Sequence, residues 1–96
     1  MNDLRYARDY SHISSAVYLD GSLRVTFRDG TTARVAAEEV VPPEAHGLHW
    51  DRLRVYSTWL RVPTDGEPVE IPWDVIRIRT DPAYRAHIEA MSARTH

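Results

Sequence analysis

Apolar residues recur at alternate positions in three consecutive stretches of the chain, 13–19, 23–27 and 31–35. A period of two is typical of a β-strand with one buried face. The dipeptides Asp20-Gly21 and Asp29-Gly30 separate the stretches and favour tight turns. The pattern therefore predicts a three-stranded antiparallel meander.

The length of each turn decides which side chains share a face, because directly opposed residues lie on the same side of a sheet. A two-residue loop at Asp20-Gly21 would set Val17 opposite Arg24 and mix apolar with charged groups. Three-residue loops, Leu19-Asp20-Gly21 and Arg28-Asp29-Gly30, give both hairpins one apolar face, each with a glycine bulge. We therefore predict the pairs Val17–Leu23, Ile13–Phe27, Val25–Ala33 and Leu23–Val35.

The middle of the chain predicts shorter elements. Residues 36–41 form one helical turn that Pro42-Pro43 ends, and residues 44–51 form a loop around a glycine. Three short strands follow, and we expect them to form a second antiparallel sheet. They are Arg52–Val55, Trp59–Val62 and Val69–Ile71.

Two helices are predicted at the carboxyl end. The first covers Trp73 to Arg79, and the second runs from Pro82 to about Arg94 with Asp81 as its cap. Its expected buried stripe is Tyr84, His87 or Ile88, and Met91. The predicted fold class is α+β, in which an antiparallel three-stranded meander and a second short antiparallel sheet carry a C-terminal helix on the apolar face.

Composition narrows the class of protein. The 96 residues form one domain, with a polar lead-in over residues 1–11 and a single domain over 12–96. No cysteine is present, which removes disulfides and thiolate chemistry. The amino-terminal residues do not resemble a signal peptide, and no stretch approaches the about 20 apolar residues that a membrane span requires. We expect a cytoplasmic protein that needs no membrane and no cofactor.

Two short motifs resemble a bacterial family. Leu23-x-Val25-x-Phe27-x-Asp29-Gly30 ends a strand, and Val69-Glu70-Ile71-Pro72-Trp73 ends the second sheet. Over residues 12–90 the chain looks like the family catalogued as domain of unknown function 2442. Residues 71–88 are similar to a subgroup in which a helix-turn-helix region follows. The resemblance implies a compact α+β fold and no assigned activity, and it suggests an antitoxin-type partner or the sensory half of a regulator.

The sequence offers little catalytic chemistry. His46, His49 and Asp51 lie close together and are residue types that bind divalent metals. A metal site needs three or four converging ligands, however, and no zinc-binding spacing is present, so a polar surface loop is the favoured interpretation. None of the serines lies in a nucleophile elbow. We predict no catalytic residue, no bound metal and no enzymatic activity.

The basic residues form the most distinctive pattern. All twelve are arginine, although the net charge is −2. The predicted register sets Arg24 directly opposite Arg34, with Arg28 on the same outer face. Either Glu38 or Glu39 neutralises these arginines, or they bind an anion on an acidic partner or a phosphate backbone.

The tryptophans suggest a second surface. Trp73 is expected in the core, and Trp59 caps the second sheet. Trp50 is either exposed for binding or folded onto the core, so Trp50 and Trp59 are the predicted partner surface. We therefore predict a non-catalytic protein-interaction or regulatory domain, with nucleic-acid binding through Arg24, Arg28 and Arg34 as the alternative. Unpaired sheet edges also allow a homodimer.

Overall fold

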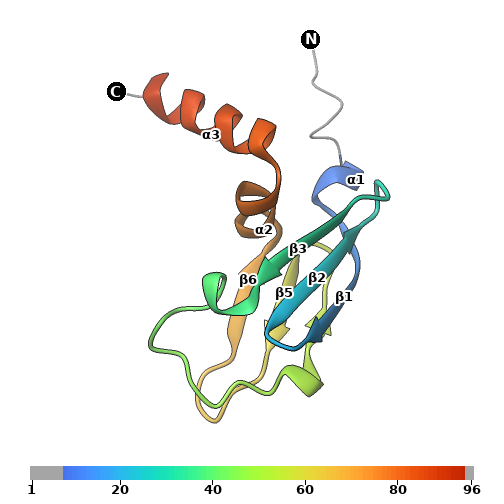
Figure 1. The fold of residues 1–96 in the computed structure, drawn as a ribbon, viewed down its shortest axis with the longest axis vertical. Helices are drawn as coiled ribbons and strands as arrows, with labels where there is room; N and C mark the ends of the chain where they lie inside the picture. The colour runs from blue at the N-terminus through green and yellow to red at the C-terminus, as the bar shows by residue number, and fades with distance from the viewer. Residues whose placement is uncertain (1–7, 95–96) are drawn as a thin grey trace.

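The computed structural model describes residues 8–94 and contains two three-stranded antiparallel sheets followed by two helices (Figure 1). A short helix, α1 (Arg8–Ser11), precedes the first sheet, whose strands are β1 (Ile13–Leu19), β2 (Ser22–Phe27) and β3 (Thr32–Ala36). The second sheet contains β4 (Arg54–Val55), β5 (Trp59–Val62) and β6 (Val69–Pro72). The 3₁₀ turns are η2 (Ala37–Glu39) and η3 (Trp50–Arg52), and the helices are α2 (Trp73–Thr80) and α3 (Pro82–Arg94). The predicted α+β class is confirmed.

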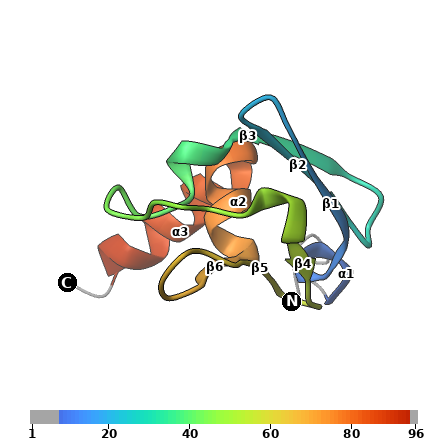
Figure 2. The ribbon, with the colours of Figure 1, turned by 90° about the horizontal axis from the view of Figure 1, so that it is seen from below.

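The hydrophobic core lies between the two sheets, which Figure 2 shows facing each other. Leu23 and Val25 of the first sheet and Leu60 and Ile71 of the second are fully buried. Ile76 of α2 is also fully buried and joins the same cluster. The alternating apolar positions of four strands therefore supply one core, which α2 closes at its end.

The second hairpin has the predicted register. Val25 pairs with Ala33 and Leu23 pairs with Val35. Beyond these pairs, the N–H of Phe27 donates to the carbonyl of Thr31, so the loop contains three residues. Gly30 ends that loop with a φ of 93°, a conformation that glycine adopts at low cost.

The predicted register of the first hairpin is wrong. Its loop has two residues, Asp20 and Gly21, with φ values of 51° and 80°, as in a type I′ turn. Val17 is consequently opposite Arg24 instead of Leu23. Aspartate tolerates the left-handed conformation, and this turn matches the twist of the strands, so the tighter loop forms despite the mixed face that it creates.

A bulge in β1 restores the apolar face at the other end of the hairpin. The register shifts between Ile13 and Ser15, so Ile13 still pairs with Phe27, as predicted. Tyr18 now points toward the core side, whereas Val17 is 57% exposed and Leu19 is 66% exposed. One extra residue thus lets both ends of β1 bury an apolar side chain.

The C-terminal helix does not pack on the sheets along its length, contrary to the prediction. Asp81 caps it as expected, since its Oδ1 accepts from the N–H of Ala83 at 3.1 Å. Only Tyr84 of the predicted stripe is buried, and Met91 is 51% exposed. α2 instead contacts the sheets, and α3 runs away from them (Figure 1). No helix within residues 8–94 is long and apolar enough to cross a membrane.

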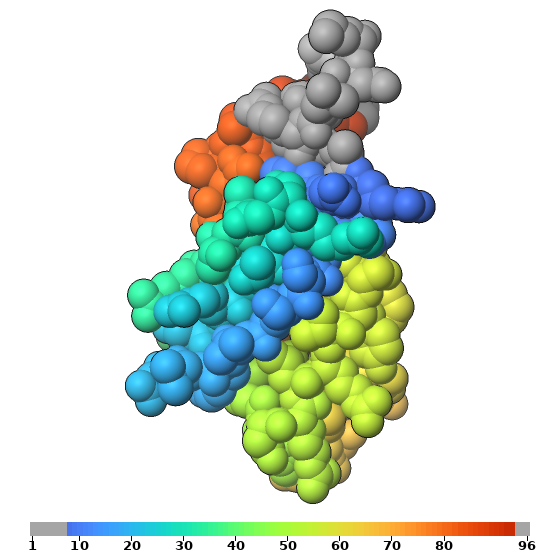
Figure 3. Space-filling view, turned by 90° about the vertical axis from the view of Figure 1, so that its right-hand side faces the viewer, coloured from blue at the N-terminus to red at the C-terminus, as the bar shows by residue number. Residues whose placement is uncertain are grey.

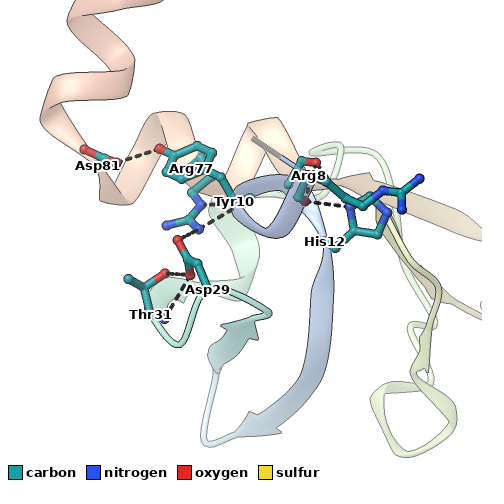
Figure 4. Close-up of polar contacts among 8 residues, drawn as sticks. Arg8, Tyr10, His12, Asp29, Thr31, Arg77 and Asp81 are labelled. Atoms are coloured by element: carbon teal, nitrogen blue, oxygen red, sulfur yellow. Dashed lines mark hydrogen bonds and ion pairs between the residues drawn. The ribbon is translucent and has the colours of Figure 1, made fainter. Parts of the chain in front are cut away.

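A buried arginine connects α2 to the amino-terminal turn and to the second hairpin (Figure 4). Arg77 is 4% exposed, and its guanidinium lies between the rings of Tyr10 and Phe27, 3.7 and 3.8 Å from their centroids. Its Nε and Nη2 donate to the carbonyl of Tyr10, and Nη2 also donates to Asp29 Oδ2 at 3.0 Å. Cation–π contacts with two aromatic rings and three donated hydrogen bonds compensate for the burial of this charge.

A second contact ties the same turn to the start of α3. The hydroxyl of Tyr10 donates to Asp81 Oδ2 at 2.5 Å. The Tyr10 ring also contacts Trp73 edge-on and Tyr84 at a tilt, at centroid distances of 6.0 and 5.6 Å. We call Tyr10, Phe27, Asp29, Arg77 and Asp81 the Arg77 cluster. Tyr10 lies in the predicted polar lead-in but is 5% exposed.

Replacing Arg77 tests this cluster. Arg77→Ala leaves the Asp29 carboxylate and the Tyr10 carbonyl without their partner, and we expect a loss of about 3 kcal/mol in the free energy of unfolding, measured by urea titration. The control is Arg79→Ala, which removes an exposed arginine 3.7 Å from Glu39. It should cost less than about 1 kcal/mol. Equal losses would mean that the cluster has no special role.

Both carboxylates of the cluster have a lowered pKa. Partial burial raises the pKa of Asp29, but hydrogen bonds from the hydroxyl and N–H of Thr31 and the charge of Arg77 outweigh it. For Asp81 the largest cause is the hydrogen bond from Tyr10. Burial opposes it, while backbone N–H groups of α3 and the charge of Arg77 lower the pKa further. The folded state therefore favours ionised carboxylates.

These pKa shifts predict loss of stability in acid. In the unfolded chain Asp29 and Asp81 titrate near the ordinary value of 3.8, so below that pH protons bind the unfolded state first. Stability is present above this value and is lost as the pH falls through the lower folded pKa. Urea midpoints measured between about pH 5 and pH 2 should fall less steeply for Asp29→Asn than for the parent chain. Parallel curves would contradict the assignment.

Candidate functional site

The predicted arginine pair lies on the outer face of the first sheet. Arg24 of β2 is directly opposite Arg34 of β3, as predicted, and both side chains are exposed. On the other side of Arg24 the neighbour is Val17 of β1. A row across the sheet therefore reads valine, arginine, arginine. With Leu19, these residues form what we call the outer arginine face.

The other residues of the arginine hypothesis lie elsewhere. Arg28 is in the loop of the second hairpin, where its Nε is 3.9 Å from the carboxylate of Asp9. Glu39 lies 3.7 Å from Arg79. Within residues 8–94 neither Glu38 nor Glu39 forms an ion pair with the outer arginine face.

Trp50 folds back onto the first sheet and lines a groove at the same time. Its ring stacks on that of Tyr18 with a centroid distance of 4.6 Å and an interplanar angle of 4°. The groove has a volume of about 810 Å³ and lies beside the tip of the first hairpin, η2 and the following loop. Its apolar lining consists of Tyr18, Ala37, Val41, Pro42, Pro43, Ala45, Leu48 and Trp50. Trp50 is therefore both folded back onto the protein and placed where it can contact a ligand in the groove.

The rim of this groove is acidic. Asp20 comes from the hairpin tip, and Glu38 and Glu39 come from η2. The backbone holds these segments together, because the N–H of Ala37 donates to the carbonyl of Gly21 at 2.9 Å. Among the residues that line the groove none is cationic. Glu39 is 3.7 Å from Arg79, whereas Asp20 and Glu38 have no ion pair among the described residues. An apolar floor with a negative rim suits a ligand that is both cationic and apolar.

The loop that forms one wall of the groove is fixed by His49 and Gly47. His49 Nε2 lies 2.9 Å from Asp65 Oδ1, and the N–H of His49 donates to the carbonyl of Pro63. Gly47 has a φ of 64°, and a Cβ built there would overlap the Asp65 carboxylate. The loop therefore stays close to the 63–67 turn.

The metal candidates do not converge. His49 pairs with Asp65, His46 Nδ1 lies 3.2 Å from the carbonyl of Glu44, and Asp51 is exposed in η3. In the part of the chain that the structure describes, no three histidine or acidic side chains are placed to hold a metal ion.

Trp59, the second predicted partner residue, lies apart from the groove. It is half-buried in β5 and stacks on Tyr56 at a centroid distance of 4.7 Å. Its Nε1 is buried and has no hydrogen-bond partner among the described residues. Trp73 is half-buried and contacts Tyr10 and Tyr84.

Sequence reasoning missed most of the groove. The predicted register turns Val17 inward and puts Leu19 in the loop, so it does not point to Tyr18 as a residue of the core side. For Glu38 and Glu39 the sequence suggests only a role as partners of the arginines. The usable signal was the sequence 37–43, in which two glutamates precede two valines and two prolines.

Comparisons with known proteins add no relative: no family model, no curated protein and no solved structure matches the chain. The resemblance carried by residues 23–30 and 69–73 therefore stays a prediction.

Substitution of Gly47 tests the wall of the groove. Gly47→Ala places a side chain at positive φ and pushes Asp65 off His49, so we expect a loss of about 2–3 kcal/mol in the free energy of unfolding. Gly30→Ala is the matched control, because Gly30 has a φ of 93° with nothing within 4 Å of the added Cβ. It should cost only the backbone strain, about 1–2 kcal/mol. Chemical denaturation measures the free energy of unfolding of both variants. An equal loss in the two would show that the Asp65 side chain moves away from the added Cβ without cost.

Proposed function

We propose that this chain is a non-catalytic protein-interaction domain that binds a basic, extended segment of a partner protein in its groove. The observation that carries the proposal is the combination of an apolar floor, built on the Tyr18–Trp50 stack, with three rim carboxylates and no cation in the lining. No residue chemistry for catalysis is needed for this role. A dedicated protein partner also fits the antitoxin-like or regulatory roles that the family resemblance implies.

Arginine and lysine match both parts of this groove. Their alkyl stems can lie on apolar surface while the charged heads reach the rim. A guanidinium also stacks on the face of an aromatic ring, and an indole is the best such partner. Alternating basic and apolar residues in an extended segment would place cations at Asp20 and Glu38 and apolar groups over Val41 and Leu48.

A peptide with this alternation tests the proposal. The probe is acetyl-Arg-Leu-Arg-Leu-Arg-amide, and its control is acetyl-Glu-Leu-Glu-Leu-Glu-amide. We expect the basic peptide to shift the amide NMR signals of residues 37–50 and to bind more weakly as salt rises. Glu38→Gln should weaken it about two- to fivefold, the effect of one exposed ion pair, and Trp50→Ala should weaken it further.

The matched control is Glu67→Gln, which removes an exposed carboxylate from the 63–67 turn away from the groove lining. It should leave the affinity unchanged. If the basic peptide shifts no groove signals, or if Glu67→Gln and Glu38→Gln weaken it equally, the groove is not a specific site and the proposal fails.

A further inference from the structure

Each sheet exposes one directly opposed pair of arginines, but only in the second sheet does an acidic residue lie in the same row. On the second sheet Arg54 is opposite Arg61, and Arg61 is in turn opposite Glu70. The row therefore reads arginine, arginine, glutamate, and the carboxylate beside Arg61 lowers the net positive charge of the row. This is the ordinary arrangement for charged residues on a solvated sheet.

The row on the first sheet lacks that acid. Arg24 and Arg34 are opposed in the same way, but the third position is Val17. Within residues 8–94 neither arginine forms an ion pair, and the next row is the neutral pair Thr26 and Thr32. Like charges that face each other destabilise a sheet. The opposition of Arg24 and Arg34 is therefore not explained by a contribution to the stability of the fold.

Exposed apolar side chains border the arginines. Val17 lies in the same row at 57% exposure, and Leu19 follows on the same face of β1 at 66%. Figure 3 shows the first sheet as a blue-to-green band that lies open on the surface. Large apolar residues exposed next to uncompensated arginines are typical of protein interfaces.

We propose that the outer arginine face is a second docking surface, which binds an acidic segment of a partner protein. Arg24 and Arg34 together hold a carboxylate, to which guanidinium groups bind as planar forks, and Val17 and Leu19 contact the apolar side chains beside it. An acidic segment supplies both the missing negative charge of the row and the apolar groups that cover the exposed pair.

The same features favour protein over nucleic acid. Affinity for a phosphate backbone comes from many cations along a path, and this face provides two. An exposed valine and leucine add nothing to phosphate contacts, whereas they add buried area to a protein interface.

This surface is independent of the groove. Val17 and Tyr18 are adjacent in β1 and point to opposite faces of the strand, so one belongs to the outer face and the other to the groove. Loss of binding at one surface therefore leaves the other intact.

The test is an amide NMR titration of the full chain with acetyl-Glu-Leu-Glu-Leu-Glu-amide. We expect shifts confined to residues 15–19, 22–26 and 32–36. Arg24→Gln and Arg34→Gln should each weaken binding about two- to fivefold, the effect of one exposed charge pair. Arg54→Gln, from the row that contains Glu70, is the matched control and should change nothing. Glu38→Gln, which tests the groove, should also leave this binding unchanged.

A thermal melt guards against misfolding, since each arginine variant removes one of two opposed like charges and should melt at or above the parent temperature. The proposal is overturned if the acidic peptide shifts no signal on this face, or if Arg54→Gln weakens it as much as Arg24→Gln. It is also overturned if a twelve-nucleotide oligothymidylate binds the face more tightly than the peptide, because that outcome assigns the surface to nucleic acid.

Discussion

The guanidinium of Arg77 contacts two segments that are distant in sequence. It donates to a backbone carbonyl 67 residues earlier and to a carboxylate 48 residues earlier, and two aromatic rings cover its faces. A buried cation tolerates little displacement, because every lost contact leaves a charge without compensation. The position of α2 against the second hairpin and α1 is fixed for this reason, and α3 follows through Asp81.

Several of the residues that carry the family resemblance belong to this arrangement, and Leu23, Val25, Val69 and Ile71 belong to the core. Phe27 covers the guanidinium, Asp29 accepts its hydrogen bond, and Gly30 completes the loop that presents Asp29. Trp73 packs against Tyr10, which lies on the other side of Arg77. These motif residues therefore have a structural role in the packing around Arg77. Most residues of the groove and of the outer arginine face lie outside these motifs.

Local signals predicted most of the fold, and non-local contacts account for what was missed. The period of two, the Asp81 cap and the three-residue loop at Gly30 each depend on a few neighbouring residues, and the structure has all three. The Arg77 cluster joins distant segments, which no periodicity reveals. The outward course of α3 could not be predicted either, because its apolar stripe resembles that of a packed helix.

The candidate site shows the same division. The opposition of Arg24 and Arg34 followed from a hairpin register that alternation determines, whereas the groove depends on how the 40–50 loop folds back. Trp50 was identified by its residue type, but its stacking partner Tyr18 became visible only with the correct register.

The bulge in β1 changes which alternate positions of that strand face the core. At its start the odd-numbered position, Ile13, faces the core, and beyond the bulge the even-numbered positions Ala16 and Tyr18 do so. The strand therefore serves the core at one end and two different surfaces at the other. Deletion of Ser14 would remove the bulge and leave the existing pairs in a continuous ladder, with Ala16 and Tyr18 still toward the core and Val17 and Leu19 still outside. The extra residue is what allows Ile13 and Tyr18, five positions apart, to face the core from the same strand.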